Sequence, residues 1–183
     1  MLRLRNSIAG VWFQATLSIA MNRQQILLAL ALEHANVPLH VDEFDERLVL
    51  QKAVYLLQEA GVHLGYRYRW HLRGPYSPDL ASDVFFLAGL QNRLKDDLEK
   101  WQLDEESKQR ISKLKEMLAG TAVSVVAKHL ELLASVLFLI RTGQVMPNDP
   151  VQISSLLQAN KKPFNREDAE RAVGELNQYG FQW

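Results

Sequence analysis

Apolar residues recur at spacings of three and four along most of the chain, which predicts a mainly helical fold. The clearest case is residues 47–60, where Leu50, Val54 and Leu57 share one stripe and Gly61 follows in the position of a helix C-cap. Further helices are expected over residues 22–35, 78–90, 104–118, 122–141, 150–159 and 165–177. We therefore expect one domain in residues 21–183, a helical bundle of about six to eight helices.

Residues 66–73 break this pattern and alternate with a period of two. One face carries Tyr66, Tyr68, Trp70 and Leu72, and the other carries Arg67, Arg69, His71 and Arg73. Aromatic enrichment and alternation together predict a half-buried strand. A strand needs a partner, so we expect a small two- or three-stranded β element here, paired with residues 38–42 or 181–183.

The stretch after this strand, Gly74-Pro75-Tyr76-Ser77-Pro78, reads as a turn followed by a helix start. Ser77 is a natural N-cap with Pro78 at the first helical position and Asp79 in the first turn. Ser77, His71 and Asp79 also have the residue types of a hydrolytic triad. No nucleophile elbow such as GxSxG is present, so the cap interpretation is favoured.

Acidic residues crowd into positions 42–46, just before the helix of residues 47–60. They favour the positive end of the helix dipole, which is the interpretation we prefer over a cation site. Residues 122–141, expected to be capped by Thr121, are nearly apolar all round, as in a membrane span. Lys128, His129 and Glu131 interrupt the run, so we expect a buried core helix and no membrane association.

Residues 1–20 are expected to be an N-terminal extension or an accessory helix, with Met21 as an alternative true start, because a strong helical pattern follows Met21. Arginines, a weakly apolar run and small residues loosely imitate a secretory signal, which is the less favoured interpretation.

Charge and composition exclude several classes of function. Lys plus Arg and Asp plus Glu number 21 each, so bulk electrostatics do not hold this protein on nucleic acid or an anionic membrane. Cysteine is absent, which excludes disulfides and thiolate chemistry. Neither a phosphate-binding loop nor an HExxH motif occurs, and no cofactor is expected. A cytoplasmic location is expected.

The basic face of the strand is the sharpest functional candidate. Three arginines on one face are suited to grip phosphate or the carboxylates of a protein partner. The alternative is an ordinary solvated strand face whose charges discourage edge pairing. The predicted contact surface consists of Arg67, Arg69, His71, Arg73, Tyr76, Ser77 and Asp79.

Four segments carry a family resemblance: LQKAVYLLQ (50–58), YRWHLRGPYSPDLASD (68–83), LELLASVLFL (130–139) and KPFNREDAERAV (162–173). Over roughly residues 22–178 the chain resembles the YwgA-like family of bacteria and archaea, and more distantly the Panacea domain of SocA-like antitoxins. The resemblance implies a mainly helical domain with a small β element. It also implies a link to toxin neutralisation or phage-defence loci through protein–protein contact.

We therefore expect a non-enzymatic protein-interaction module, antitoxin-like or a phage-defence accessory, whose partner is a toxin or defence component. One alternative is a nucleic-acid-binding regulator with a winged-helix-like arrangement, in which the arginine row contacts phosphate. A second alternative is an uncharacterised hydrolase. A homodimer is also considered, because the apolar content is large for the helices that the pattern places.

Overall fold

The computed structural model describes residues 2–4, 21–90 and 92–183, and this part of the chain contains eight helices and four short strands. The helices are α1 (Arg23–Ala35), α2 (Phe44–Glu59), α3 (Pro78–Leu90), α4 (Asn92–Leu98), α5 (Glu105–Leu118), α6 (Val123–Arg141), α7 (Pro150–Ala159) and α8 (Arg166–Gln178). The strands are β1 (Leu2–Leu4), β2 (Arg69–His71), β3 (Gly74–Tyr76) and β4 (Trp101–Leu103). The fold is mainly helical with small β elements, as the hydrophobic pattern predicts.

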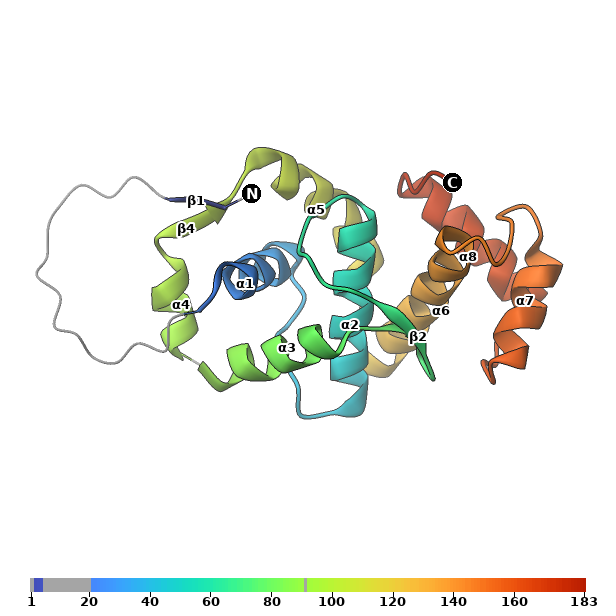
Figure 1. Ribbon diagram of the computed structural model, residues 1–183, viewed down its shortest axis with the longest axis horizontal. Helices are drawn as coiled ribbons and strands as arrows, with labels where there is room; N and C mark the ends of the chain where they lie inside the picture. Colours follow the sequence, from blue (N-terminus) through green and yellow to red (C-terminus); the bar gives the residue numbers. More distant parts are fainter. Residues whose placement is uncertain (1, 5–20, 91) are drawn as a thin grey trace, which may run out of the picture.

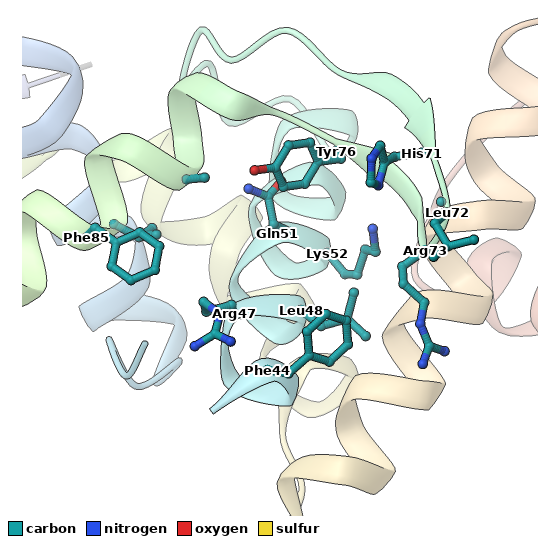
Figure 2. Close-up of a pocket in the computed structure, with 13 residues that line it drawn as sticks. Phe44, Arg47, Leu48, Gln51, Lys52, His71, Leu72, Arg73, Tyr76 and Phe85 are labelled. Carbon is teal, nitrogen blue, oxygen red and sulfur yellow. The ribbon is translucent and has the colours of Figure 1, made fainter. Parts of the chain in front are cut away.

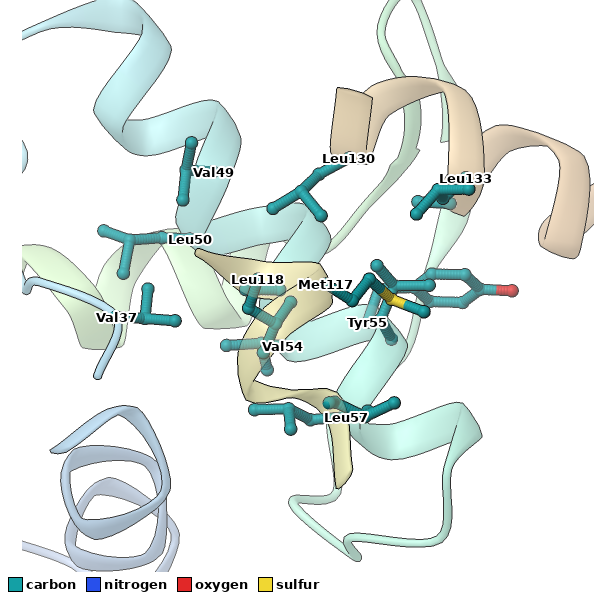
Figure 3. Close-up of a cluster of buried hydrophobic side chains, with 14 of the residues drawn as sticks. Val37, Val49, Leu50, Val54, Tyr55, Leu57, Met117, Leu118, Leu130 and Leu133 are labelled. Carbon is teal, nitrogen blue, oxygen red and sulfur yellow. The ribbon is translucent and has the colours of Figure 1, made fainter. Parts of the chain in front are cut away.

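Helix α2 lies near the centre of the molecule, where α3, α5, α6 and β3 pack against it (Figure 1). Ten consecutive residues of α2, Leu48–Leu57, are buried, so the helix is covered on every side. Figure 3 shows Val54 of α2 in a cluster with Met117 of α5 and Leu130 of α6. Each such buried side chain contributes roughly 2 kcal/mol of hydrophobic stabilisation.

Helix α6 packs along α2, while α7 and α8 pack on each other and α8 on α6 (Figure 1). By length and composition, α6 is the one helix in the described ranges that could cross a membrane. Most of its residues are buried inside the molecule, including the charged Glu131. This burial agrees with the interpretation of residues 122–141 as a core helix.

Local capping explains where the helices begin. Asn165 accepts a hydrogen bond from the Asp168 backbone N–H, which confirms the predicted start of α8. The acidic stretch is a helix entry, as predicted, with the Glu43 N–H donating to the Glu46 carboxylate at 2.9 Å. The predicted Thr121 cap of α6 is wrong, because Ala122 occupies the N-cap position without a side-chain hydrogen bond.

The strand prediction needs two corrections. β2 is shorter than expected and pairs with Gly74–Tyr76, the strand next to it in the chain, rather than with residues 38–42 or 181–183. The alternation of buried and exposed side chains holds from Tyr66 to Trp70 but fails at Leu72, which is exposed because it lies in the hairpin turn.

The structure tests the predicted N-terminal extension or accessory helix, residues 1–20, only at residues 2–4. Residues 2–4 form strand β1, antiparallel to β4, so an accessory helix does not include them. The remainder of the predicted extension, residues 5–20, lies outside the described residues.

Candidate binding pocket beneath the hairpin

The β2–β3 hairpin turns through Leu72 and Arg73 and closes at Gly74. Gly74 has φ of +81°, a conformation that side-chain-bearing residues rarely adopt. A Cβ at this position would also lie 2.3 Å from the hydroxyl oxygen of Ser135 on α6. Glycine therefore lets the hairpin rest directly on helix α6.

Two glutamines of α2 hold the backbone of the segment that carries the hairpin. Gln58 Nε2 donates to the Tyr66 carbonyl at 3.0 Å, and the Tyr66 N–H donates to Gln58 Oε1 at 2.7 Å. Gln51 makes the same pair of bonds to Ser77, at 2.9 and 3.0 Å. The two glutamines lie seven positions apart, about two helical turns, so they fix both ends of the segment on one face of α2.

Lys52 occupies the same face of α2 beneath the hairpin. Its ammonium donates to the Pro75 carbonyl at 2.5 Å, and the side chain is 1% exposed. Burial lowers the pKa of Lys52 to about 7, because the charged form loses its hydration. The nearby positive charges of Lys162 and Arg73 lower this pKa further, whereas Glu131 acts in the opposite direction.

A pocket of about 330 Å³ opens between α2, the hairpin and α3 (Figure 2), and we call it the hairpin pocket. Its volume lies in the range of small-ligand sites. The apolar part of its lining is Phe44, Leu48, Leu72, Ala81, Val84 and Phe85. The polar part is Arg47, Gln51, Lys52, His71, Arg73 and Tyr76. Four of these polar residues are arginine, lysine or histidine, and no described Asp or Glu lines the pocket.

Large apolar side chains are exposed at the mouth of this pocket. Phe44 and Phe85 are each 52% exposed, and Leu72 is 66% exposed. Figure 2 shows that they come from α2, α3 and the hairpin turn, respectively. The Arg73 guanidinium also lies over the Phe44 ring, 5.7 Å from its centroid. The pocket thus combines an apolar rim with positive charge.

A buried carboxylate on α6 anchors the turn of the hairpin. Glu131 Oε2 accepts from Arg73 Nη1 at 3.0 Å, and Oε1 accepts from Lys162 Nζ at 2.6 Å. Lys162 also donates to the Leu72 carbonyl at 3.2 Å, and burial lowers its pKa. Around the hairpin, the buried Lys52 and Lys162 and the exposed Arg73 therefore surround Glu131, the one buried acid among the described residues.

Three of the seven residues of the predicted contact surface line the hairpin pocket, and the other four do not. His71, Arg73 and Tyr76 line the hairpin pocket, and the rings of His71 and Tyr76 lie 5.3 Å apart. Arg67 and Arg69 are exposed on the same segment but do not line the pocket.

The acidic residues after the turn do not neutralise the arginine row. Asp79 is exposed in the first turn of α3, outside the pocket lining. Asp83 accepts from the Tyr66 hydroxyl at 2.7 Å and from Gln25 Nε2 at 2.8 Å. Within the described ranges, neither acid forms an ion pair with the row. The arginines of the row therefore remain available to a partner, except that Arg73 pairs with Glu131.

Ser77 has a structural position. It is buried, and its hydroxyl oxygen accepts from the Leu80 N–H at 3.3 Å, as expected for the N-cap of α3. Among the described contacts no hydrogen bond joins Ser77 to His71, so the geometry does not assemble the triad considered from the sequence. Burial also separates the Ser77 side chain from any surface that a partner reaches.

Sequence reasoning missed several residues of this site. In the sequence pattern, Lys52 lies outside the apolar stripe of its helix, and Phe44 precedes the helix expected over residues 47–60. The capping box of Glu43 and Glu46 starts α2 at Phe44, earlier than the apolar stripe indicates, and so brings Phe44 onto the same helix as Leu48 and Lys52. Glu131 was noted only as an interruption of an apolar run. In the described ranges, no three His, Asp or Glu residues gather as a metal site would require.

Fold and site together define a mainly helical protein with a basic, apolar-rimmed pocket beneath a β-hairpin. No family model, no curated protein and no solved structure matches the chain.

Proposed function

We propose that this protein is a non-enzymatic protein-interaction module whose hairpin pocket docks an apolar side chain from an acidic segment of a partner. The observation that carries the proposal is the convergence of three exposed side chains, Phe44, Leu72 and Phe85, around one pocket. No Asp or Glu lines this pocket among the residues that the structure describes. The three residues come from three separate elements of the fold, which together form the pocket mouth.

Apolar exposure supports a macromolecular occupant. Eight large apolar side chains are exposed among the described residues, and three of them share this pocket mouth. Clustered apolar exposure with a polar rim is typical of interaction sites, whereas scattered apolar residues are ordinary on protein surfaces. Phenylalanine and arginine are also enriched in protein interfaces.

Charge supports an acidic partner. Arg67 and Arg69 are exposed beside the pocket, and His71 and Arg73 line it. Complementary charge steers association and excludes partners of the same sign. A segment bearing Asp or Glu next to an apolar residue fits this combination best.

The resemblance to YwgA-like proteins and to the Panacea domain supports the biological setting. Under this proposal, the protein is antitoxin-like or a phage-defence accessory, and its partner is a toxin or another defence component in the cytoplasm. The nucleic-acid alternative uses the same arginines but leaves the apolar mouth without a purpose. A net charge of zero also favours the protein partner.

Selection from a random peptide library displayed on phage tests the proposal. We expect the wild-type protein to enrich peptides in which an aromatic or aliphatic residue lies beside Asp or Glu. The Leu72→Ser/Phe85→Ser variant should lose these peptides. The matched control Val125→Ser/Met146→Ser changes two equally exposed apolar residues outside the pocket lining and should retain them.

Two results would contradict the proposal. One is enrichment of basic peptides, or of none that share a motif. The other is a motif whose recovery falls equally with both double variants, because the contact would then not depend on the hairpin pocket.

A further inference from the structure

Lys52 is a buried cation with unused hydrogen-bonding capacity. A lysine ammonium has three N–H donors, and the described contacts use one of them, at the Pro75 carbonyl. No described carboxylate accepts from Lys52. Glu131, the acid that favours its charged form, is already bound by Lys162 and Arg73. A buried charge without a counter-ion is costly, so this site favours an anion supplied from outside.

The Lys52 side chain is also placed where a ligand in the hairpin pocket could reach it. It lines the hairpin pocket, and Figure 2 shows its amine directed toward the hairpin strand. The two guanidinium groups of the lining already have partners in the protein. Arg47 Nη1 donates to the carbonyls of Val41 and Asp42 at 2.6 and 2.7 Å, and Arg73 pairs with Glu131. Among the described lining residues, Lys52 is therefore the buried cation that lacks a carboxylate partner.

We propose that an acidic side chain of the partner segment enters the hairpin pocket and binds the Lys52 ammonium through its carboxylate. The neighbouring apolar side chain of the same segment then packs against Phe44 and Phe85 at the mouth. This inference rests on the proposed function and names the chemical group that the pocket recognises.

Proton linkage follows from this contact. Lys52 has a pKa of about 7 in the free protein, and a bound carboxylate raises that pKa. Binding above neutral pH therefore takes up a proton, so affinity should fall as pH rises. Lys162 and Arg73 oppose the charge on Lys52, and Glu131 favours it. The other charged or titratable residues of the described pocket lining are Arg47, His71 and Tyr76.

Two small probes of nearly the same shape, one anionic and one neutral, test the carboxylate site. We would titrate 4-phenylbutyrate and its neutral amide, 4-phenylbutyramide, into the protein and follow backbone NMR shifts of the pocket residues at about pH 6 and about pH 9. The carboxylate should bind about 10-fold more tightly than the amide near pH 6, the scale of a charge-assisted hydrogen bond. The preference should shrink at the higher pH.

Lys52→Met should abolish the preference while leaving the weak apolar binding of both probes. Lys128→Met, which removes an exposed lysine of α6, should leave the preference unchanged. Equal affinity of the two probes for the wild type would overturn the inference, and so would a preference that survives Lys52→Met. The first of these two results, equal affinity for the wild type, would overturn the inference even if Lys52→Met does not fold.

These outcomes are separable from those of the proposed function. If peptide selection yields a motif that depends on the pocket but the probes show no carboxylate preference, the docking proposal stands and the Lys52 contact is wrong. If the probes show the preference but no peptide motif emerges, the carboxylate site stands and the macromolecular partner is wrong.

Discussion

Gln51 binds the main chain of Ser77 with both ends of its amide, donating to the carbonyl at 2.9 Å and accepting from the N–H at 3.0 Å. All of these groups are buried, 26 positions apart in the chain. A side-chain amide thus does what a neighbouring strand does in a sheet, and it fixes the start of α3 on α2.

Replacing Gln51 should therefore be costly. Gln51→Ala leaves a buried N–H and a buried carbonyl of Ser77 without partners, and we expect a loss of roughly 2–4 kcal/mol in the free energy of unfolding. Urea denaturation measures this loss. Gln109→Ala, at an exposed position of α5, serves as the control and should be close to neutral. A loss below about 1 kcal/mol for Gln51→Ala would show that the two hydrogen bonds between Gln51 and Ser77 contribute little to stability.

Helices were predictable because their signals are local. The apolar spacing, the Asn165 and Asp149 caps and the Ser77-Pro78 start each lie within a few residues of the element that they define. The burial of the polar residues of α2 was not predictable from the sequence, for the opposite reason. Gln51 and Lys52 look solvent-facing in a helical pattern, and only the path of the later hairpin segment covers them.

The site was less predictable than the fold because its contacts are long-range. Arg73 and Glu131 are 58 positions apart, and Glu131 and Lys162 are 31 apart. No spacing rule pairs such residues. The alternation did place His71 and Arg73 on one face, but the turn at Leu72 and the burial of Ser77 changed which neighbours contribute to the surface.

Removing the carboxylate of Glu131 should destabilise the protein, because this group binds Arg73 and Lys162 beside the hairpin turn. Glu131→Gln leaves Lys162 buried without a counter-ion, and we expect a loss of about 3–5 kcal/mol in the free energy of unfolding. Glu106→Gln removes an acid from an exposed pair with Arg110 and should leave the melting temperature unchanged. Thermal and urea unfolding of both variants make the comparison. Equal behaviour of the two would contradict the role assigned to Glu131.

Stability should rise with pH above neutrality. The pKa of Lys52 is about 7 in the folded protein against an ordinary value of 10.5, so between these values the unfolded chain binds more protons than the native one. The free energy of unfolding then increases with pH, by at most about 1.4 kcal/mol per pH unit for this group. The lowered pKa of Lys162 acts in the same direction.

Urea unfolding at several values between about pH 7 and pH 9 measures this slope. Lys52→Met should give a flatter profile than the wild type, because the mutant lacks the titrating amine. Below the folded-state pKa, Lys52 is protonated in both states and contributes no slope. Identical profiles for the two proteins would exclude Lys52 as the source.

The exposed arginines should act on the rate of association. Arg67→Ser/Arg69→Ser removes positive charge beside the pocket without touching its lining. We expect a several-fold slower association with an acidic pocket-binding peptide at low salt and little change in dissociation, as for charges at the rim of an interface. Surface plasmon resonance at two ionic strengths measures both rates. An effect confined to dissociation would place these arginines in the contact itself.

Site-specific photo-crosslinking in the native cells tests the central claim most directly. A photoreactive phenylalanine analogue placed at Leu72 samples the mouth of the hairpin pocket, and the same analogue at Val125 samples an exposed apolar position outside its lining. Mass spectrometry of the cross-linked peptides identifies what each position contacts. We predict that position 72 captures one protein segment in which an apolar residue lies beside Asp or Glu, and that position 125 does not. Capture of nucleic acid, capture of a basic segment, or the same products from both positions would contradict the account.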